Sequence, residues 1–461
     1  MHSIGIDIGG THIRAARVSA TGEILARAAA PSSPDPTIVF DRCLSLIAQI
    51  RTPECTAIGI GIPGQVVAAT RIILSGGYVD LSGFDFAAKV QDACILPVTI
   101  ENDATMALLG EAACGAAKGA LNVVMLTIGT GIGGAILEQG QVLRGCGTAG
   151  QLGHIVVDPD GVPCVCGRIG CVETTSSGTA FGGHLACAGL PADTRAEDLM
   201  ARTDPSARGV LAAWARPLRQ AIDSLTTICN PDLVVLGGGA GAGAVAALQL
   251  FPSTQSWFTA PVVAALLGDD AGVIGAAISA LPKPKRVIMV NGVPASGKST
   301  VANALSAVTG WPILRLDTIK DPFLRELGPA DRPFNRTLGR ASYAAIFDIL
   351  RDAPTGTTMI IDAWFGFQPG QILTQGLISA GITDTAELWC HAPPEITGAR
   401  YAARTSDRPA GHPGADYVPE LIALAAKAQP MAIGPLRPID TTITLDLTAL
   451  LNWLKLPHQR T

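Results

Sequence analysis

The sequence predicts an α/β protein in two parts, a two-lobed unit over residues 1–281 and a second α/β domain over residues 287–461. Short apolar runs typical of strands alternate with Ala- and Leu-rich runs typical of helices. A strand that ends in a glycine turn occurs at Ile4–Thr11 and again at Val123–Gly134, which indicates a duplicated lobe with a cleft between the copies. Residues 282–286 contain two prolines and three cations and cannot continue a helix, so we expect a linker there.

The composition excludes several classes of protein. Apolar residues make up 48% of the 461 residues and charged residues 15%, which is typical of a well-packed globular chain and excludes a disordered one. The net charge of −5 argues against nonspecific nucleic-acid binding. No apolar run reaches the roughly 20 residues of a membrane helix, and no signal peptide is evident, so we expect no membrane association and a cytoplasmic location. The 11 cysteines are then expected to be reduced thiols or metal ligands.

The first glycine turn follows an apolar strand and reads Asp7-Ile-Gly9-Gly10-Thr11. Glycines let backbone N–H groups approach a phosphate closely, and a carboxylate at the strand end can hold Mg²⁺ through water. An ordinary Gly-Gly hairpin explains this segment alone equally well.

A carboxylate stands at a second junction, where Glu101-Asn102-Asp103 joins an apolar run to a helical one. Such a carboxylate is often only a helix cap. As a catalytic group, Asp103 would accept the proton of a substrate hydroxyl while that hydroxyl attacks the γ-phosphate of ATP.

Two further glycine segments follow strands. One contains Gly129, Thr130, Gly131 and Gly133, and the other contains Gly237, Gly238 and Gly239. The first matches the phosphate-sized turn at the start of the chain. Each segment, taken by itself, is also a common kind of turn after a strand in α/β proteins.

The strongest indication of a metal site is a group of four residues within a stretch of 18 that contains several glycines: His154, Cys164, Cys166 and Cys171. Three thiols and one imidazole are the donors of a closed structural zinc site. Buried free cysteines are the alternative. The other eight cysteines are scattered and are expected to be small core residues.

These motifs stand in one order that resembles the ROK family of bacterial sugar kinases and sugar-responsive repressors, over almost all of residues 1–281. The resemblance implies an actin/hexokinase-like (ribonuclease H-like) fold with ATP and sugar in the cleft, and a homodimer formed through this unit. It implies Asp103 as the base. Asn102, His154 and Glu173 would hold sugar hydroxyls. Asp7, Thr11, Thr130 and the neighbouring glycines would lie around the phosphates and Mg²⁺. Gly237–Gly239 would lie near the nucleoside.

Two departures from the family pattern affect these expectations. Gln151 stands where the family usually has Glu; it can still hydrogen-bond a sugar hydroxyl but lacks the charge, so we expect a shifted substrate preference or a weaker activity. Residues 75–84 lack the Asn and Trp often found there. No helix-turn-helix precedes Met1, so the repressor branch is not expected.

The second domain opens with a phosphate-binding motif. The pattern Gly-x-x-x-x-Gly-Lys-Ser runs from Gly292 to Gly297, Lys298 and Ser299, between an apolar strand and a helical start at Thr300. This is the context of a P-loop, in which backbone N–H groups surround the phosphates, the lysine bridges the β and γ oxygens, and the serine binds Mg²⁺.

Other candidate residues of this domain lie at two strand ends and on a helix. Asp317 is expected where small P-loop kinases hold the acceptor, and Asp362 at a Walker-B position; strand-end capping is the alternative for both. Arg400, Arg404 and Arg408 have i, i+4 spacing and suit a lid over the phosphates or a solvated helix face. The domain resembles small-molecule kinases of the zeta-toxin, gluconate-kinase and chloramphenicol-phosphotransferase type, and is short for an AAA+ motor module.

Two functions follow, and a third is disfavoured. The leading hypothesis is ATP-dependent phosphorylation of a hexose or amino-hexose hydroxyl, with O6 the expected acceptor, by the first unit, beside a second phosphotransferase of unknown acceptor. The alternative makes the P-loop domain the main kinase and the first unit a sugar sensor weakened by Gln151. A purely regulatory protein is disfavoured because Asp103 and Lys298 are both present. The expected ligands are ATP, Mg²⁺, Zn²⁺ and a sugar.

Overall fold

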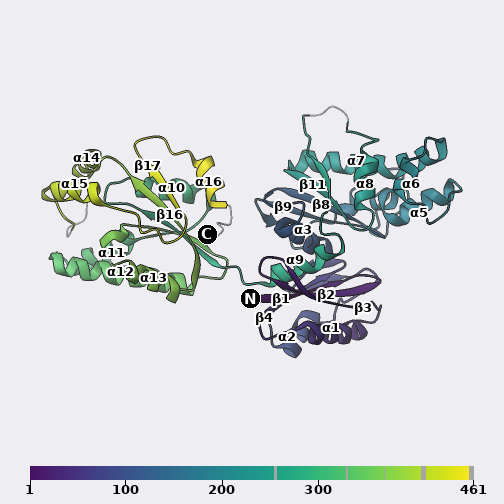
Figure 1. Cartoon of the computed structure of the whole chain (residues 1–461), viewed down its shortest axis with the longest axis horizontal. Helices are drawn as coiled ribbons and strands as arrows, with labels where there is room; N and C mark the ends of the chain where they lie inside the picture. Colours follow the sequence, from purple (N-terminus) through teal and green to yellow (C-terminus); the bar gives the residue numbers. More distant parts are fainter. Residues whose placement is uncertain (254–256, 329–330, 368, 406–411, 456–461) are drawn as a thin grey trace. The chain divides into compact units, whose positions relative to one another are not determined.

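The structure is a computed structural model that describes residues 1–253, 257–328, 331–367, 369–405 and 412–455. The chain divides into two compact units, Met1–Leu281 and Pro282–Thr461, which are considered separately. Figure 1 shows the elements of both. None of the described helices is both long and apolar enough to span a bilayer.

The first lobe is a five-stranded sheet in the order β3-β2-β1-β4-β7. Strands β1 and β2 are antiparallel, as are β2 and β3, whereas β1, β4 and β7 are parallel. Helices α1 (Pro36–Ile50) and α2 (Phe86–Cys94) pack their apolar faces onto this sheet in one core cluster. The strands are β1 (His2–Ile8), β2 (His12–Ser19), β3 (Ile24–Pro31), β4 (Cys55–Ile62) and β7 (Val98–Asn102); a small hairpin, β5 (Gln65–Val67) and β6 (Ile72–Ser75), follows β4.

The second lobe repeats this arrangement. Its sheet has the order β10-β9-β8-β11-β12, with β8 antiparallel to β9 and parallel to β11. One face is covered by α7 (Pro205–Cys229) and α8 (Gly241–Leu248), with α5 (Gly178–Cys187) and α6 (Ala196–Met200) beside them. The predicted two-lobed fold is thus confirmed by two sheets of identical order. The strands are β8 (Val123–Ile128), β9 (Ile132–Glu138), β10 (Gln141–Val142), β11 (Leu233–Gly237) and β12 (Val262–Ala264).

Two helices, α3 (Asp103–Cys114) and α9 (Ala271–Ala280), pack together between the lobes (Figure 1). Their contacts are backbone against backbone. A Cβ on Gly275 would lie 1.7 Å from the carbonyl oxygen of Met106, and a Cβ on Gly59 of β4 would lie 1.8 Å from that of Ala276. Such distances leave no room for any side chain, so glycines at these positions hold α9 close to β4 and α3.

The second unit is a parallel sheet in the order β14-β15-β13-β16-β17 with helices on both faces. One face packs on α12 (Arg332–Asp352) and α13 (Gly370–Ser379), the other on α10 (Lys298–Thr309) and α16 (Leu447–Lys455). This confirms the predicted P-loop α/β fold. The remaining elements are β13 (Lys285–Asn291), β14 (Ile313–Arg315), β15 (Thr358–Ala363), β16 (Ile382–His391), β17 (Leu436–Asp440), α11 (Leu316–Leu327), α14 (Pro394–Ala402) and α15 (Val418–Lys427).

Two expected boundaries are wrong by a few residues. The linker expected over residues 282–286 is shorter, because β13 already begins at Lys285. Lys285 donates hydrogen bonds to two carbonyls at the end of α12, and Arg286 pairs with Asp384 at 3.3 Å. Asp317 does not end a strand but lies in the first turn of α11, which follows β14 directly.

Candidate active sites

The two carboxylates of the first unit meet at the carboxyl edge of its sheet. Asp7 lies near the end of β1, Asp103 is the first residue of α3, and β4 runs between β1 and β7. A Cβ on Gly61 of β4 would lie 3.5 Å from the Asp103 Cα and 3.6 Å from the Asp7 Oδ1. The Met106 Cγ would lie 3.4 Å from the same position, so Gly61 lies between Asp7 and the start of α3 and leaves the two acids close together at this edge.

Burial of this pair shifts both acids toward neutrality. Burial raises the pKa of Asp103 from 3.8 to about 6. Burial and the nearby Asp103 charge raise the pKa of Asp7 from 3.8 to about 7, although Arg14, 3.8 Å away, acts in the opposite direction. A carboxylate that titrates near neutrality is suited to accept a hydroxyl proton, and two neighbouring acids could hold a divalent cation that would neutralise their charge.

Hydrogen bonds around Asp103 organise the strand-to-helix junction. The Asn102 side chain caps α3, since its Oδ1 accepts from the Thr105 N–H at 3.2 Å. Its Nδ2 donates to the Gly64 carbonyl at 2.9 Å and to Asp103 Oδ1 at 3.0 Å, and the Ala104 N–H also donates to Asp103 Oδ1. Because these bonds orient Asp103 through Oδ1, its Oδ2 is the oxygen best placed to take a substrate proton.

The glycine turns lie at the ends of β1, β8 and β11. Gly9, Gly10 and Thr11 connect β1 to β2, with Gly10 and Thr11 exposed. Gly129, Thr130 and Gly131 connect β8 to β9, whereas Gly133 lies within β9, where a Cβ would be 2.6 Å from the Thr127 Oγ1.

The turn after β8 lies beside the glycines after β11, as the predicted nucleotide site requires. These strands are neighbours, with Gly237 opposite Thr127, and the Ala240 N–H donates to the Ile128 carbonyl at 3.0 Å. Gly238 has φ +75°, and a Cβ there would lie 2.5 Å from the Ile128 oxygen. Only glycine suits this position. Gly239 follows with open space around it.

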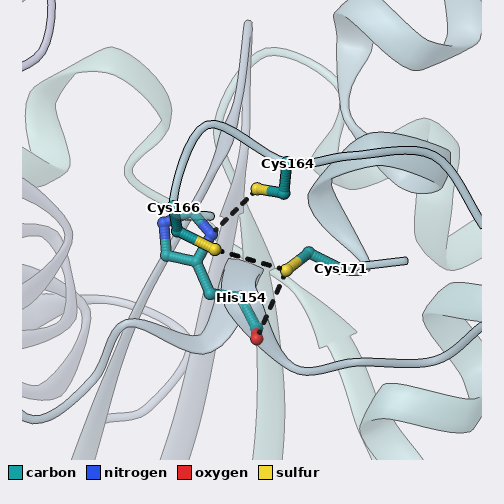
Figure 2. A group of neighbouring side chains, drawn as sticks. All are labelled: His154, Cys164, Cys166 and Cys171. Atoms are coloured by element: carbon teal, nitrogen blue, oxygen red, sulfur yellow. Dashed lines mark hydrogen bonds between the residues drawn. The ribbon is translucent and has the colours of Figure 1, made fainter. Parts of the chain in front are cut away.

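The structure also brings the four expected metal ligands together (Figure 2). The donor atoms of His154, Cys164, Cys166 and Cys171 all lie within 4.8 Å of one another. The Cys164 Sγ is 3.5 Å from the His154 Nδ1, and the Cys166 and Cys171 sulfurs are 3.6 Å apart. Ligands of a tetrahedral zinc ion with Zn–S bonds of about 2.3 Å stand at about this separation, so the donor set fits zinc.

Glu173 connects this cluster to the second glycine turn. It begins the short helix α4 (Glu173–Ser176), two residues after Cys171, and its Oε2 accepts from the Ile132 N–H at 2.8 Å. His154 ends the 3-10 helix η1 (Leu152–His154), directly after Gln151. Of the three sugar-binding residues expected here, His154 belongs to the cluster and Gln151 lies three residues before it, and Glu173 contacts the turn after β8, where a Cβ on Gly131 would lie 2.5 Å from its Oε2.

The P-loop of the second unit has the expected form. Gly297 has φ +88°, and α10 begins at Lys298 with Ser299 and Thr300 in its first turn. A Cβ on Gly292, which begins the loop, would lie 2.3 Å from the Cys390 oxygen. The Lys298 Nζ donates to the Val293 carbonyl at 3.0 Å; burial lowers its pKa, while Asp362 and Asp317 act in the opposite direction. This lysine lies among acids that match the two predicted carboxylate positions.

A cavity of about 740 Å³ opens beside the P-loop. Lys298, Ser299, Thr300, Asp317 and Asp362 line it, and so does Arg404. Arg400 has a different role, since its guanidinium binds the hydroxyl and the carbonyl of Thr441, both at 2.9 Å. Arg408 lies outside the described residues.

Comparisons with known proteins agree with this geometry. The model of the ROK family matches residues 3–283, and one for an AAA domain matches residues 287–416. The chain belongs to the ROK family. A glucokinase of Halalkalibacterium halodurans is 32% identical over 307 residues, which cover 59% of this chain and 92% of the relative. An N-acetylmannosamine kinase of Escherichia coli is 31% identical over 294 residues, which cover 61% and 98%.

A solved structure extends this similarity to three dimensions. A ROK family glucokinase from Streptomyces griseus, in complex with glucose and AMPPNP, is 30% identical with a TM-score of 0.54, over 61% of this chain and 99% of that one. The match ends with the ROK unit, so the P-loop domain is an addition to the part shared with this relative. The predicted order of a ROK unit followed by a P-loop domain is confirmed.

Sequence reasoning missed several residues of both sites. In the ROK unit, Arg144 pairs with the buried Glu101 at 3.0 Å, next to Asn102. In the P-loop domain, Arg315 pairs with Asp362 at 3.2 Å, and Arg336 and Arg340 line the cavity. No local motif contains these arginines. The i, i+4 spacing of Arg336 and Arg340 was the one available signal, and it is common on solvated helices.

Proposed function

We propose that the ROK unit transfers the γ-phosphoryl group of ATP to a hydroxyl of a hexose or amino-hexose, with O6 as the expected position. The family and its sugar-kinase relatives support the class of reaction, an ATP-dependent sugar kinase. The observation that carries the proposal is the pair Asp7 and Asp103, two partly buried acids with raised pKa values at the carboxyl edge of the first sheet. Glucose and N-acetylmannosamine are the substrates that the relatives' names suggest.

In this mechanism Asp103 is the base. The sugar hydroxyl binds beside Asp103 Oδ2, which takes its proton as the oxygen attacks the γ-phosphorus; the bond to the bridging oxygen breaks and ADP leaves. Asn102, Gln151, His154 and Glu173 hold other hydroxyls. Asp7 and Thr11 face the phosphates, together with the turn from Gly129 to Gly131. Mg²⁺, when bound near Asp7, neutralises charge that develops on the phosphate oxygens.

We also propose a structural role for zinc in sugar recognition. The residues present fit a Cys₃His site, which would hold zinc through His154 Nδ1 and three sulfurs. The other ring nitrogen of His154 is then free to face the sugar. Zinc, when bound, fixes the loop that carries Gln151, His154 and Glu173, and it takes no part in phosphoryl transfer.

A coupled ADP-release assay on a panel of neutral hexoses and amino-hexoses tests the main proposal. Wild-type chain is compared with Asp103→Asn and with Asp232→Asn. Asp232 is a suitable control because, in the part of the chain that the structure describes, its carboxylate accepts from two backbone N–H groups at 2.9 Å and forms no ion pair, and it lies far along the chain from the proposed base. Sugar-dependent turnover that survives Asp103→Asn unchanged would exclude Asp103 as the base.

We propose a second phosphotransferase activity for the P-loop domain. Lys298, Ser299, Asp317 and Asp362 line one cavity, which supports nucleotide binding beside an acceptor. The alternative, in which this domain is the main kinase and the ROK unit a sugar sensor, predicts that Lys298→Ala abolishes sugar phosphorylation. The homodimer and the cytoplasmic location expected from the sequence stay predictions; sedimentation velocity tests the first.

A further inference from the structure

The cavity of the P-loop domain has a wall that nucleotide binding alone does not explain. One face of α12 forms it, through Asn335, Arg336, Gly339, Arg340 and Tyr343. Their spacing places them on one side of the helix. A Cβ on Gly339 would meet no atom within 4 Å, so the wall borders open space rather than packed side chains.

The two cations of this wall, Arg336 and Arg340, are exposed. Elsewhere in the cavity, Arg315 pairs with Asp362 at 3.2 Å and Lys320 with Asp317 at 3.9 Å. By contrast, Arg336 and Arg340 form no ion pair with any residue that the structure describes, and Arg340 donates only to the Thr337 hydroxyl, at 3.0 Å. Two adjacent guanidinium groups beside a cavity bind a compact anion well, because each offers a planar fork of donors to a carboxylate or phosphate.

This pair is distinct from the cations that serve the transferred phosphoryl group. Lys298 begins α10 at the P-loop, and Arg404 lies close enough to it to help lower its pKa. Arg336 and Arg340 come from another helix, on the side of the sheet where α12 packs. Asp317, in the first turn of α11, lines the same cavity, and α11 packs against α12.

Aromatic side chains complete the space. Trp364 and Phe367 line the cavity with ring centroids 6.1 Å apart at 80°, and Tyr343 on α12 is anchored by its hydroxyl, which donates to the Trp364 carbonyl at 2.7 Å. Such faces pack against the C–H groups of a small ring or polyol chain. The cavity therefore offers a place for an anionic group, for a carbon skeleton and for a hydroxyl beside a carboxylate.

We propose that the P-loop domain phosphorylates a small polyhydroxylated acceptor that already carries a phosphate or carboxylate group, which Arg336 and Arg340 bind. The inference rests on the phosphotransferase activity proposed above. The acceptor oxygen bonds to the γ-phosphorus of ATP as the bond to the bridging oxygen breaks; ADP leaves, and the hydroxyl proton passes to Asp317. Sugar monophosphates, the chemical class that a sugar kinase produces, meet these requirements, and so do sugar acids.

The experiment uses the full chain with Asp103→Asn, which lowers the turnover of the ROK unit by about 10²–10⁴-fold, and three acceptors: a hexose 6-phosphate, a hexonate and the neutral hexose. ADP release is measured, and mass spectrometry identifies a sugar bisphosphate or a phosphorylated hexonate. We expect turnover with at least one anionic acceptor and little with the neutral sugar. Comparing the hexose 6-phosphate with the hexonate shows whether the site binds a phosphate or a carboxylate group. Lys298→Ala should abolish the turnover.

Charge-neutral variants of the two arginines test whether they bind the anionic group of the acceptor. Arg336→Gln and Arg340→Gln should each raise the acceptor KM by about tenfold to a hundredfold, the usual cost of a lost charge-assisted hydrogen bond, while the KM for ATP changes little. Arg351→Gln is the matched control, since Arg351 also lies on α12 but pairs with Asp348 at 2.7 Å and does not line the cavity. Two results would exclude an anionic acceptor: equal turnover of neutral and anionic acceptors, or an unchanged acceptor KM in both Arg336→Gln and Arg340→Gln. Neither result would contradict the proposed phosphotransferase activity itself. No turnover above the Lys298→Ala background overturns both the acceptor class and the activity.

Discussion

Replacing the proposed base should make the protein less active and yet more stable. Burial raises the pKa of Asp103 from 3.8 to about 6, so the folded state favours the protonated acid more strongly than the unfolded chain does. About two pKa units correspond to roughly 3 kcal/mol of difference between the ionised and neutral forms. Asn is neutral at every pH and keeps an oxygen that accepts from the Ala104 N–H and from Asn102 Nδ2, the bonds that Asp103 Oδ1 now makes.

The sign of the effect depends on pH. Because the folded pKa is raised, the stabilising contribution of protonated Asp103 is complete below about pH 3.8 and is lost as the pH rises through about 6. At pH 8 the Asp103 carboxyl of the wild-type protein is therefore ionised, and the folded state bears the full cost of that partly desolvated charge. We expect Asp103→Asn to be more stable than wild type by about 2–3 kcal/mol at pH 8, with the difference vanishing near pH 4. Loss of the Asp103 charge also removes one cause of the raised pKa of Asp7, which acts in the same direction.

Urea unfolding without nucleotide or metal, followed by peptide-resolved hydrogen exchange over residues 98–114, measures this difference in the ROK unit alone. The same variant should lose about 10²–10⁴-fold in sugar-dependent kcat, the usual contribution of a positioned base. Wild-type activity should fall as the pH drops through the pKa of Asp103, shifted by bound Mg²⁺ and substrate. A variant that is equally stable at both pH values, or less stable at pH 8, would refute the claim that Asp103 is held as a desolvated acid.

Three other perturbations have expected outcomes. Freshly purified chain should contain about one zinc ion, and Cys166→Ser should lose zinc and sugar affinity together; metal analysis without zinc would contradict this. Lys298→Ala should reduce two sites for a nonhydrolysable ATP analogue to one in calorimetry and spare most sugar kinase activity, whereas loss of that activity in a folded protein would favour the P-loop domain as main kinase. Gly275→Ala should lower the stability of the ROK unit by about 1–3 kcal/mol or more, because its Cβ would lie 1.7 Å from a carbonyl oxygen; Gly77→Ala, with nothing within 4 Å, is the control in the same thermal unfolding experiment.

Local signals in the sequence carried most of the fold prediction. An apolar run followed at once by glycines, as at Ile4–Thr11 and Val123–Gly134, predicts both a strand and the residue at which the strand ends. This motif occurs twice, and the structure has two sheets of identical strand order. The cysteines and His154 lie within one short stretch, so their proximity in space could be expected. The start of α11 was missed because Leu316 is apolar and fits the end of a strand as well as the start of a helix.

Contacts between distant segments could not be predicted in this way. The close approach of α9 to β4 and α3 depends on single glycines, such as Gly59 and Gly275, whose partners lie far away in the sequence. The pairing of Arg144 with Glu101 and the position of Arg336 on the wall of the P-loop domain's cavity are of the same kind, since each depends on the fold. A glycine in a strand can mark a bulge or a bend as well as a close approach, and arginines are common on solvated helix faces, so these residues carry no signal until the elements are placed.

The two proposed phosphotransferase sites use separate sets of groups. The proposed site of the ROK unit takes its acids and turns from residues between Asp7 and Gly239, and the cavity of the P-loop domain is lined by residues between Pro294 and Glu420. Each set includes a phosphate-binding turn and a carboxylate for the acceptor proton, so neither domain needs a group from the other to complete its site. The fusion fixes the two domains in equal numbers, and with them the two proposed sites. Equal numbers matter most when one site consumes what the other makes. The proposed anion site, Arg336 and Arg340, which form no ion pair in the described part of the chain, is the feature that such a sequence of reactions would require.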